Sequence, residues 1–143
     1  MALLALSGAV AGCSEPSSSG TFTAKLETSD GSYPLPLVLT DETGLVTGME
    51  AAAPDPTLDY RDLVARSDPA SANAFIVSWL GGACDKNASL SFKTSEGVYE
   101  LHVTTHGNIG FPGGCTANGI FRDIRILTSK PLPIDSIVAA GQT

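Results

Sequence analysis

Phe75-Ile76-Val77-Ser78-Trp79-Leu80 is the stretch of the sequence that decides the fold. Apolar side chains occupy both sets of alternating positions in it, which is typical of a strand covered on both faces. Phe75, Val77 and Trp79 would share one face of such a strand. The sequence therefore predicts a central β-strand here, with Trp79 buried in the core.

Alternation with a period of two continues on both sides of this strand. Apolar residues recur at every second position over 35–39, a turn follows at Asp41-Glu42-Thr43-Gly44, and residues 45–49 run back, which predicts a hairpin. The same pattern over 89–104, around Thr94-Ser95-Glu96-Gly97, predicts a second hairpin. Three more strands are expected, one at 120–127 and two edge strands at 21–26 and 134–138.

These strands predict an all-β fold. Roughly seven to eight short strands with frequent Gly and Pro turns, and no sustained helical period, indicate an antiparallel β-sandwich. Immunoglobulin domains order their markers as Cys, Trp, Cys, whereas Trp79 here precedes both Cys84 and Cys115. We therefore expect an immunoglobulin-like sandwich with one disulfide, and not an immunoglobulin domain. A short helix from Asp55-Pro56-Thr57 to Arg66 is the one exception that the sequence allows.

The charge of the chain excludes one class of partner. The 143 residues carry a net charge of −7 and are enough for one domain with a sizeable core. Residues 14–68 contain ten acidic and three basic residues and so hold the whole net charge, while residues 69–143 are balanced. Neither half offers the basic surface that binding of nucleic acid requires. No nucleic-acid partner is therefore expected.

The first residues have the composition of an export signal. An apolar run over residues 2–11 leads into Val10-Ala11-Gly12-Cys13, and it is shorter than the about 20 residues that span a bilayer. No basic residue precedes Lys25, so the start of the signal peptide is expected to be truncated or misplaced. An apolar N-terminal strand with Cys13 buried in it is the alternative interpretation.

Val10-Ala11-Gly12-Cys13 resembles the lipobox of bacterial lipoproteins. The resemblance implies that residues 1–12 are a signal peptide and that Cys13 becomes the lipidated N-terminus. Residues 13–20 would then be the lipidated cysteine and a flexible polar spacer, followed by the sandwich domain over 21–143. The implied location is extracytoplasmic, with the protein anchored to a membrane through its lipid.

The cysteine count predicts one disulfide. Exported proteins usually pair their thiols, and lipid on Cys13 leaves Cys84 and Cys115, each in a Gly-rich turn. A bond between them would close a loop of about thirty residues and stabilise the fold by roughly 3–4 kcal/mol. A metal-binding or reactive thiol is the alternative, but neither cysteine lies in a motif of that kind.

This disulfide would bring two Gly-rich turns together at one end of the sandwich. Asp85, Phe111 and Asn118 lie near those turns in the sequence, and loops on a rigid scaffold are common binding sites. These three residues are therefore the candidate binding residues. Residues 79–85 also look similar to a stretch of small secreted bacterial proteins without assigned function, and this loose resemblance implies no activity.

The two histidines suggest a metal site only weakly. His102 and His106 are four residues apart, which suits a shared metal ion on a helix. On the expected strand their Cα atoms would lie roughly 13 Å apart with parallel side chains, too far to share one ion. We therefore expect both histidines to lie on a solvent-exposed face of the sheet. Asp55, Asp59 and Asp62 similarly lack the spacing of a calcium-binding loop.

Catalytic signatures do not stand out in the sequence. The Gly-x-Ser-x-Gly pattern is absent, and no Gly-rich stretch is followed by the Lys-Ser/Thr of a nucleotide loop. The sequence therefore predicts a non-enzymatic binding or structural module without a cofactor, whose partner is a protein or another envelope component. A metal-handling or enzyme-accessory lipoprotein that uses His102 and His106 is the alternative.

Overall fold

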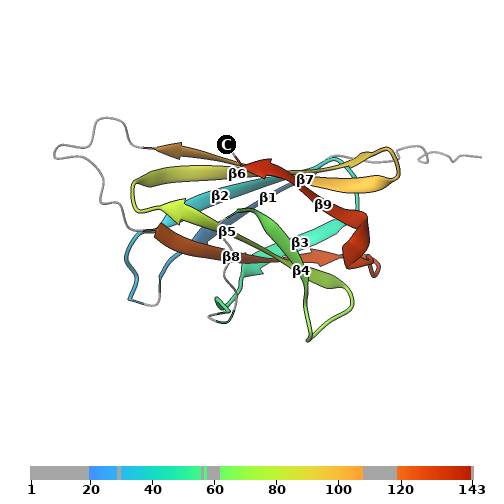
Figure 1. Cartoon of the computed structure of the whole chain (residues 1–143), viewed down its shortest axis with the longest axis horizontal. Helices are drawn as coiled ribbons and strands as arrows, with labels where there is room; N and C mark the ends of the chain where they lie inside the picture. Colours follow the sequence, from blue (N-terminus) through green and yellow to red (C-terminus); the bar gives the residue numbers. More distant parts are fainter. Residues whose placement is uncertain (1–19, 29, 56, 58–61, 108–118, 143) are drawn as a thin grey trace, which may run out of the picture.

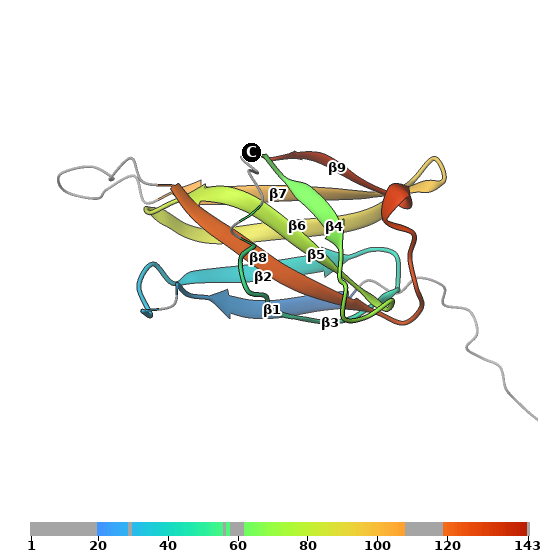
Figure 2. The same cartoon turned by 60° about the horizontal axis from the view of Figure 1, so that its bottom comes forward.

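The computed structural model describes residues 20–28, 30–55, 57, 62–107 and 119–142. Within these ranges, nine β-strands form two sheets, and one short 3-10 helix, η2, spans Ile134–Ser136. The two sheets lie face to face as the layers of a sandwich (Figure 1, Figure 2). The prediction of an all-β protein built from short strands in two sheets is confirmed.

One sheet has five strands and the other has four. The five-stranded sheet has the spatial order β1-β2-β6-β7-β9. Its strands are β1 (Gly20–Leu26), β2 (Leu35–Asp41), β6 (Asp85–Ser95), β7 (Val98–Gly107) and β9 (Ile137–Gln142). The four-stranded sheet has the order β3-β8-β5-β4. Its strands are β3 (Val46–Ala51), β4 (Val64–Ser67), β5 (Ala74–Gly82) and β8 (Gly119–Thr128).

Only the four-stranded sheet is antiparallel throughout. In the five-stranded sheet β2 runs parallel to β6, and β7 runs parallel to β9. The prediction of an entirely antiparallel sandwich was therefore wrong. The reason lies in the connections: between β2 and β6, and again between β7 and β9, the chain passes through an odd number of strands of the other sheet and returns in its original direction.

The core follows the alternation of the sequence. In β2 every second residue from Leu35 to Asp41 is buried, and the residues between them are exposed. The first six residues of β5 are buried on both faces, as expected for a central strand. Trp79 and Val77 are completely buried, and Phe75 is nearly so, which confirms the predicted placement of Trp79.

The predicted hairpin over 35–49 is a crossing between the sheets instead. β2 belongs to the five-stranded sheet and β3 to the four-stranded sheet. The buried carboxylate of Asp41 fixes the corner between them. Its Oδ1 accepts hydrogen bonds from the backbone N–H of Thr43 at 2.8 Å and from the Thr43 hydroxyl at 2.6 Å. Its Oδ2 accepts one from the backbone N–H of Val46 at 3.0 Å, so a side chain takes the place of a partner strand here.

Most of the other predicted strands are present. The second hairpin is confirmed as β6 and β7, the strand over 120–127 as β8, and the N-terminal edge strand as β1. The C-terminal edge strand starts later than expected. Pro133 leads into η2, and β9 begins only at Ile137.

The helix that the sequence allowed as far as Arg66 is wrong at its C-terminal end. Residues Val64–Ser67 form β4, which pairs with β5 from Val64 opposite Ser78 to Ser67 opposite Phe75. Pairing with β5, the most apolar strand, gives the backbone of residues 64–67 hydrogen-bond partners. This pairing outweighs the helix-capping preference of residues 55–57. Residues 58–61 lie outside the described residues.

We predict that Asp41→Ala destabilises the domain by about 3 kcal/mol. The substitution removes the acceptor for three hydrogen bonds and leaves the buried N–H of Val46 without a partner. Urea unfolding measures the loss. Thr40→Ala, at the exposed neighbouring position of the same strand, is the control and should change the free energy of unfolding by less than about 0.5 kcal/mol. Equal stability of the two variants would show that the corner is held by something other than Asp41.

Candidate functional site

Strand register gives the sandwich two distinct ends. Gly20, the first residue of β1, lies opposite Asp41, and Asp41 lies beside Phe92 of β6. We call this the Gly20 end. The seven residues of β1 then lead away from it to Leu26, which lies opposite Leu35.

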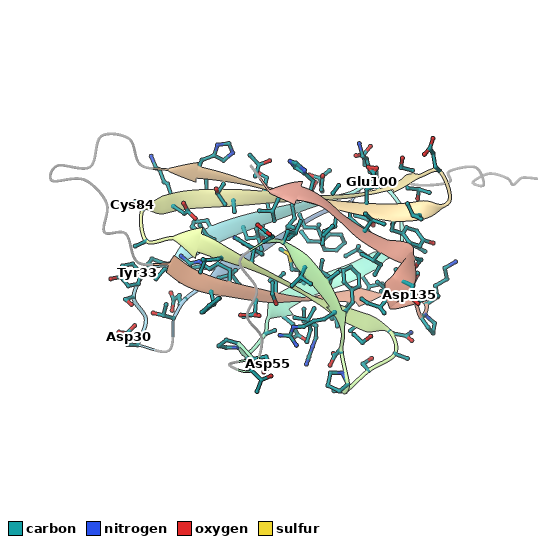
Figure 3. The ribbon with its side chains drawn as sticks, in the orientation of Figure 1. Asp30, Tyr33, Asp55, Cys84, Glu100 and Asp135 are labelled. Carbon is teal, nitrogen blue, oxygen red and sulfur yellow. The ribbon has the colours of Figure 1, made fainter. Side chains whose placement is uncertain are left out.

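The other end is formed by the turn between β5 and β6. Gly82 at the end of β5 lies opposite Gly119, and Asp85 at the start of β6 lies opposite Gly107. Cys84 is in the turn, so we call this the Cys84 end. Figure 3 shows Cys84 and Tyr33 on the same side of the molecule, far from Asp135.

Of the candidate binding residues, the structure places Asp85 at the Cys84 end. Phe111, Cys115 and Asn118 lie outside the described residues. Of the three cysteines, only Cys84 is among the described residues.

A buried arginine lies at this end, on the inner face of the four-stranded sheet. Arg122 is opposite Trp79 in the register of β5 and β8, and only 2% of its surface is exposed. One guanidinium nitrogen, Nη1, donates a hydrogen bond to the backbone carbonyl of Tyr33 at 2.8 Å. The other two, Nε and Nη2, are buried and have no acceptor among the described residues. Burial lowers the pKa of Arg122, and the nearby charge of Asp85 acts in the opposite direction.

Asp85 and Trp79 approach Arg122 around Gly81. The Oδ2 atom of Asp85 accepts a hydrogen bond from the backbone N–H of Gly82 at 2.8 Å. A Cβ atom on Gly81 would lie 2.8 Å from that oxygen and 3.6 Å from both Trp79 Nε1 and Arg122 Cγ. A side chain at position 81 would therefore displace the Asp85 carboxylate. The indole Nε1 of Trp79 is also buried. These three nitrogens have no acceptor within the described part of the chain, and a buried donor left without a partner costs roughly 1–3 kcal/mol.

The loop between β1 and β2 presents the Tyr33 carbonyl to Arg122. The carboxylate of Asp30 accepts hydrogen bonds from the backbone N–H of Ser32 at 3.0 Å and from the hydroxyl groups of Ser32 and Thr28 at 2.6 Å each. These bonds, first those from the Ser32 and Thr28 side chains, lower the pKa of Asp30 to about 2. Tyr33 then takes a left-handed backbone conformation with φ of 52°. A local hydrogen-bond network thus shapes the loop that contacts Arg122.

A cavity of about 420 Å³ opens beside Arg122. Glu27 and Thr28 of the β1–β2 loop line it together with Arg122 and Asp123 of β8. The rest of the wall is mainly apolar and comes from Leu26, Ala51, Ala52, Pro54, Ile120 and Phe121. Its size and mixed lining are those of a small-ligand pocket.

The histidines lie elsewhere, on the outer face of the five-stranded sheet. His102 is opposite Ser91 and His106 is opposite Asn87 in β6. The two histidines are therefore four residues apart along one strand. His102 lines a hollow of about 290 Å³ with Ser91, Lys93, Glu100 and Ala140. Among the described residues no three His, Cys, Asp or Glu side chains are grouped as metal ligands.

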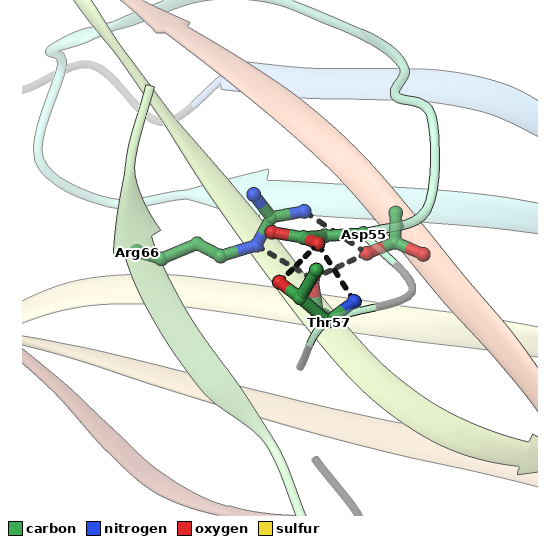
Figure 4. A network of polar contacts seen from close by, with 5 residues as sticks. Asp55, Thr57 and Arg66 are labelled. Carbon is green, nitrogen blue, oxygen red and sulfur yellow. Dashed lines mark hydrogen bonds and ion pairs between the residues drawn. The ribbon is translucent and has the colours of Figure 1, made fainter. Parts of the chain in front are cut away.

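A second polar network covers the outer face of the four-stranded sheet. The buried Asp123 carboxylate accepts hydrogen bonds from Ser78 at 2.5 Å and from Arg66 at 3.3 Å. Asp55 accepts hydrogen bonds from the backbone N–H and hydroxyl of Thr57 and lies beside Arg66 (Figure 4). These bonds, with a smaller contribution from Arg66, lower the pKa of Asp55. Asp62 takes part in no calcium site that the described residues form, and Asp59 lies outside them.

Sequence reasoning missed Arg122, although the signal was present. Alternation along residues 119–128 puts Arg122 on the same face as Ile124 and Ile126, both completely buried. An arginine in an inward-facing row is rare unless something pairs with it. The Trp79 indole and the Tyr33 carbonyl had no comparable signal, since their closeness to Arg122 comes from two separate strands, β5 and β8, and a loop.

Comparisons with known proteins place the chain in no family. No family model, curated protein or solved structure matches it. No helix within the described ranges is long and apolar enough to cross a membrane. The fold and the site define the chain as an all-β protein of two facing sheets, with a mainly apolar pocket beside a buried arginine at one end.

Proposed function

We propose that this chain is a bacterial lipoprotein whose immunoglobulin-like sandwich is a non-enzymatic binding module outside the cytoplasm. Cys13 carries the lipid, and the Cys84 end carries the binding site. The observation that supports this arrangement is the separation of Gly20 from the Cys84 end. Because β1 enters the domain at the Gly20 end, the spacer over 14–19 leads to the end of the sandwich that is farthest from Arg122 and Asp85.

This arrangement favours binding away from the membrane. Along β1 the two ends are separated by roughly 20 Å, at about 3.3 Å for each residue. A tether at one end leaves the pocket at the other end open to partners in the surrounding space. The partner is a protein or another envelope component, since the chain lacks the basic surface that would favour nucleic acid.

We propose further that Cys84 is joined to Cys115. Gly119, four residues after Cys115, lies opposite Gly82 at the Cys84 end, and four residues span at most about 14 Å. Cys13 is seven residues before Gly20, which lies at the other end. It would reach Cys84 only with its chain fully extended along the sheet. The register therefore favours Cys115 as the partner and leaves Cys13 for the lipid.

The lipid anchor predicts that Cys13→Ser releases the protein from membranes. Two acyl chains on that sulfur form a stable anchor, and serine has no thiol to receive them. The measurement is fractionation after expression in a bacterial host behind a signal peptide with a basic n-region. Ser14→Ala, at the next residue, is the control and should stay in the membrane fraction. If Cys13→Ser still sediments with membranes after a carbonate wash, the lipoprotein proposal fails.

The proposed orientation predicts that two exposed lysines of β6 lie at different distances from the membrane surface. Lys86 lies at the Cys84 end and Lys93 near the Gly20 end, roughly 23 Å apart along the strand. A fluorophore attached at Lys93→Cys should be quenched more strongly by headgroup-labelled quencher lipids than one at Lys86→Cys, in the lipidated protein on vesicles. Equal quenching, or stronger quenching at position 86, would contradict a membrane-distal Cys84 end.

The disulfide predicts that the double variant Cys84→Ala/Cys115→Ala unfolds at lower temperature while keeping its strand signature in circular dichroism. Loss of the cross-link should cost roughly 3–4 kcal/mol, because the unfolded chain regains the freedom of a loop of about thirty residues. Peptide mapping under non-reducing conditions should find the two cysteine-containing peptides linked. A bond from Cys84 to Cys13 in that map would refute both the pairing and the lipidation.

A further inference from the structure

The cavity beside Arg122 offers an apolar surface to a partner. Leu26, Ile120 and Phe121 supply much of its wall, and Phe121 is half-exposed. A large apolar side chain that entered the cavity would cover these groups and gain hydrophobic contact. The volume of about 420 Å³ is enough for one such side chain. An anchor of this kind, one side chain in one pocket, carries much of the binding energy in many protein interfaces.

The polar groups in the wall of the cavity are closed to a partner. The Nε and Nη2 atoms of Arg122 each have less than 1 Å² of accessible surface. The side chain of Asp123 is only 1% exposed, and its carboxylate is occupied by Ser78 and Arg66. Contact inside the cavity is therefore apolar, and any charged group of the partner stays outside it.

Three carboxylates lie at or next to the wall of the cavity. Glu27 lines it directly, and the Asp30 carboxylate accepts a hydrogen bond at 2.6 Å from the hydroxyl of Thr28, which lines it too. Asp55 follows Pro54, another residue of the wall. Asp30 and Asp55 both lie along the lower margin of the molecule in Figure 3. An apolar cavity is thus combined with an acidic rim.

Nearby cations offset only part of this negative charge. Lys25 pairs with Glu27 at 3.2 Å. Arg66 is shared by Asp55 and the buried Asp123. Around the cavity the carboxylates outnumber the cations by two, with Glu27, Asp30, Asp55, Asp85 and Asp123 against Lys25, Arg66 and Arg122.

The exposed carboxylates of the rim keep their charge at neutral pH. Hydrogen bonds from the side chains of Ser32 and Thr28 lower the pKa of Asp30 to about 2. Hydrogen bonds from Thr57 lower the pKa of Asp55. The donors of these bonds are neutral hydroxyl and backbone groups, which leave the negative charge in place. Such surface charge attracts the opposite charge of a partner and favours the matching orientation.

We propose that this cavity is the docking site of a basic protein segment, which places one large apolar side chain in the cavity and flanking lysine or arginine residues over the carboxylates of Glu27, Asp30 and Asp55. The inference names the partner class of the binding end in the proposed function and rests on that function only in this respect. It does not depend on the lipid anchor, so membrane release and segment binding succeed or fail separately.

Charge argues against a second copy of this chain as the occupant. Each copy has a net charge of −7, and residues 14–68 hold all of it. This acidic half supplies Leu26, Glu27 and Pro54 to the cavity. A second copy would therefore bring more negative charge to an acidic rim, whereas a basic segment is attracted to it.

Peptide titration tests the proposal. The probe is a fluorescein-labelled peptide, Lys-Lys-Gly-Phe-Gly-Lys-Lys with blocked ends. The protein is the full chain with Cys13→Ser, so that neither acyl chains nor detergent compete for the cavity. Fluorescence anisotropy should show saturable binding that weakens at about 1 M salt, where charges in solvent are screened beyond about 3 Å. Alanine in place of the peptide phenylalanine should weaken binding at least about tenfold, and glutamate in place of its lysines should abolish binding.

Variants of the wall locate the site in the protein. Ala52→Leu fills the cavity and should weaken binding of the peptide at least about tenfold. Phe121→Ala removes part of the wall from a half-exposed position and should also weaken binding, which covers the case in which Ala52→Leu does not fold. Ala140→Leu adds the same side chain to the hollow beside His102 and is the matched control, which should bind like the parent.

Variants of the rim test the charges. Asp30→Asn with Asp55→Asn removes two carboxylates and keeps the side-chain oxygens that accept the local hydrogen bonds, and it should weaken binding at least about threefold. The matched control is Glu100→Gln with Asp135→Asn, which removes the same charge at positions far from Asp30 in Figure 3. This control should bind like the parent.

A small cationic amphiphile is the competing occupant. 2-Phenylethylamine carries the same ring with one charge and should bind at least about tenfold more weakly than the peptide, because it cannot reach several carboxylates at once. The proposal is overturned if this amine binds as tightly as the peptide or if the peptide does not bind. It is also overturned if the alanine or glutamate peptide binds equally well, if Ala52→Leu and Phe121→Ala both bind like the parent, or if the two double charge variants have equal affinity.

Discussion

The Asp41 carboxylate is the interaction on which the arrangement of the two sheets depends. The chain must leave the five-stranded sheet after β2 and join the four-stranded sheet at β3, and at that corner the backbone loses its ladder partners. Asp41 supplies them from its side chain, with three hydrogen bonds that reach as far as the backbone of Val46. Each bond to a charged acceptor stabilises more than a neutral one, and burial makes the corner rigid. The facing layers, the common core and the two distinct ends follow from this crossing.

The two ends of the sandwich differ in chemistry. At the Gly20 end the aromatic rings of Phe75, Phe92 and Tyr99 pack with centroids 5.5 Å apart from one ring to the next, and the buried Asp41 carboxylate has hydrogen-bond partners. At the Cys84 end the interior contains Arg122, with Asp85 and the Trp79 indole close by. A buried polar group without hydrogen-bond partners reduces stability, whereas an aromatic core increases it. The two ends of the core therefore contribute differently to stability.

Charged side chains also lie on the outer face of the four-stranded sheet, and there they form ion pairs with each other. Arg125 forms ion pairs with Asp68 at 2.9 Å and with Glu50 at 3.4 Å, while Arg66 contacts Asp123 at 3.3 Å. Both arginines that the described part of this face contains, Arg66 and Arg125, therefore have a carboxylate partner. Arg122 differs, because two of its nitrogens have no acceptor among the described residues.

The sequence by itself determined which residues face the core, and only the tertiary structure decided which strands are neighbours. Strict alternation in residues 35–41 and the continuous apolar run over 75–80 identified β2, β5 and the burial of Trp79, because side chains alternate faces along any strand. The same alternation does not indicate which strands pair. Residues 45–49 would also fit a hairpin with β2, but the buried hydrogen bonds of Asp41 direct them to the other sheet. The candidate site likewise contains one part that the sequence could predict and one part that it could not. Asp85 could be selected from its place beside a cysteine in a turn, whereas the pocket around Arg122 brings together β1, β3, β8 and the loop before β2, whose distances are set by packing between segments far apart in the chain.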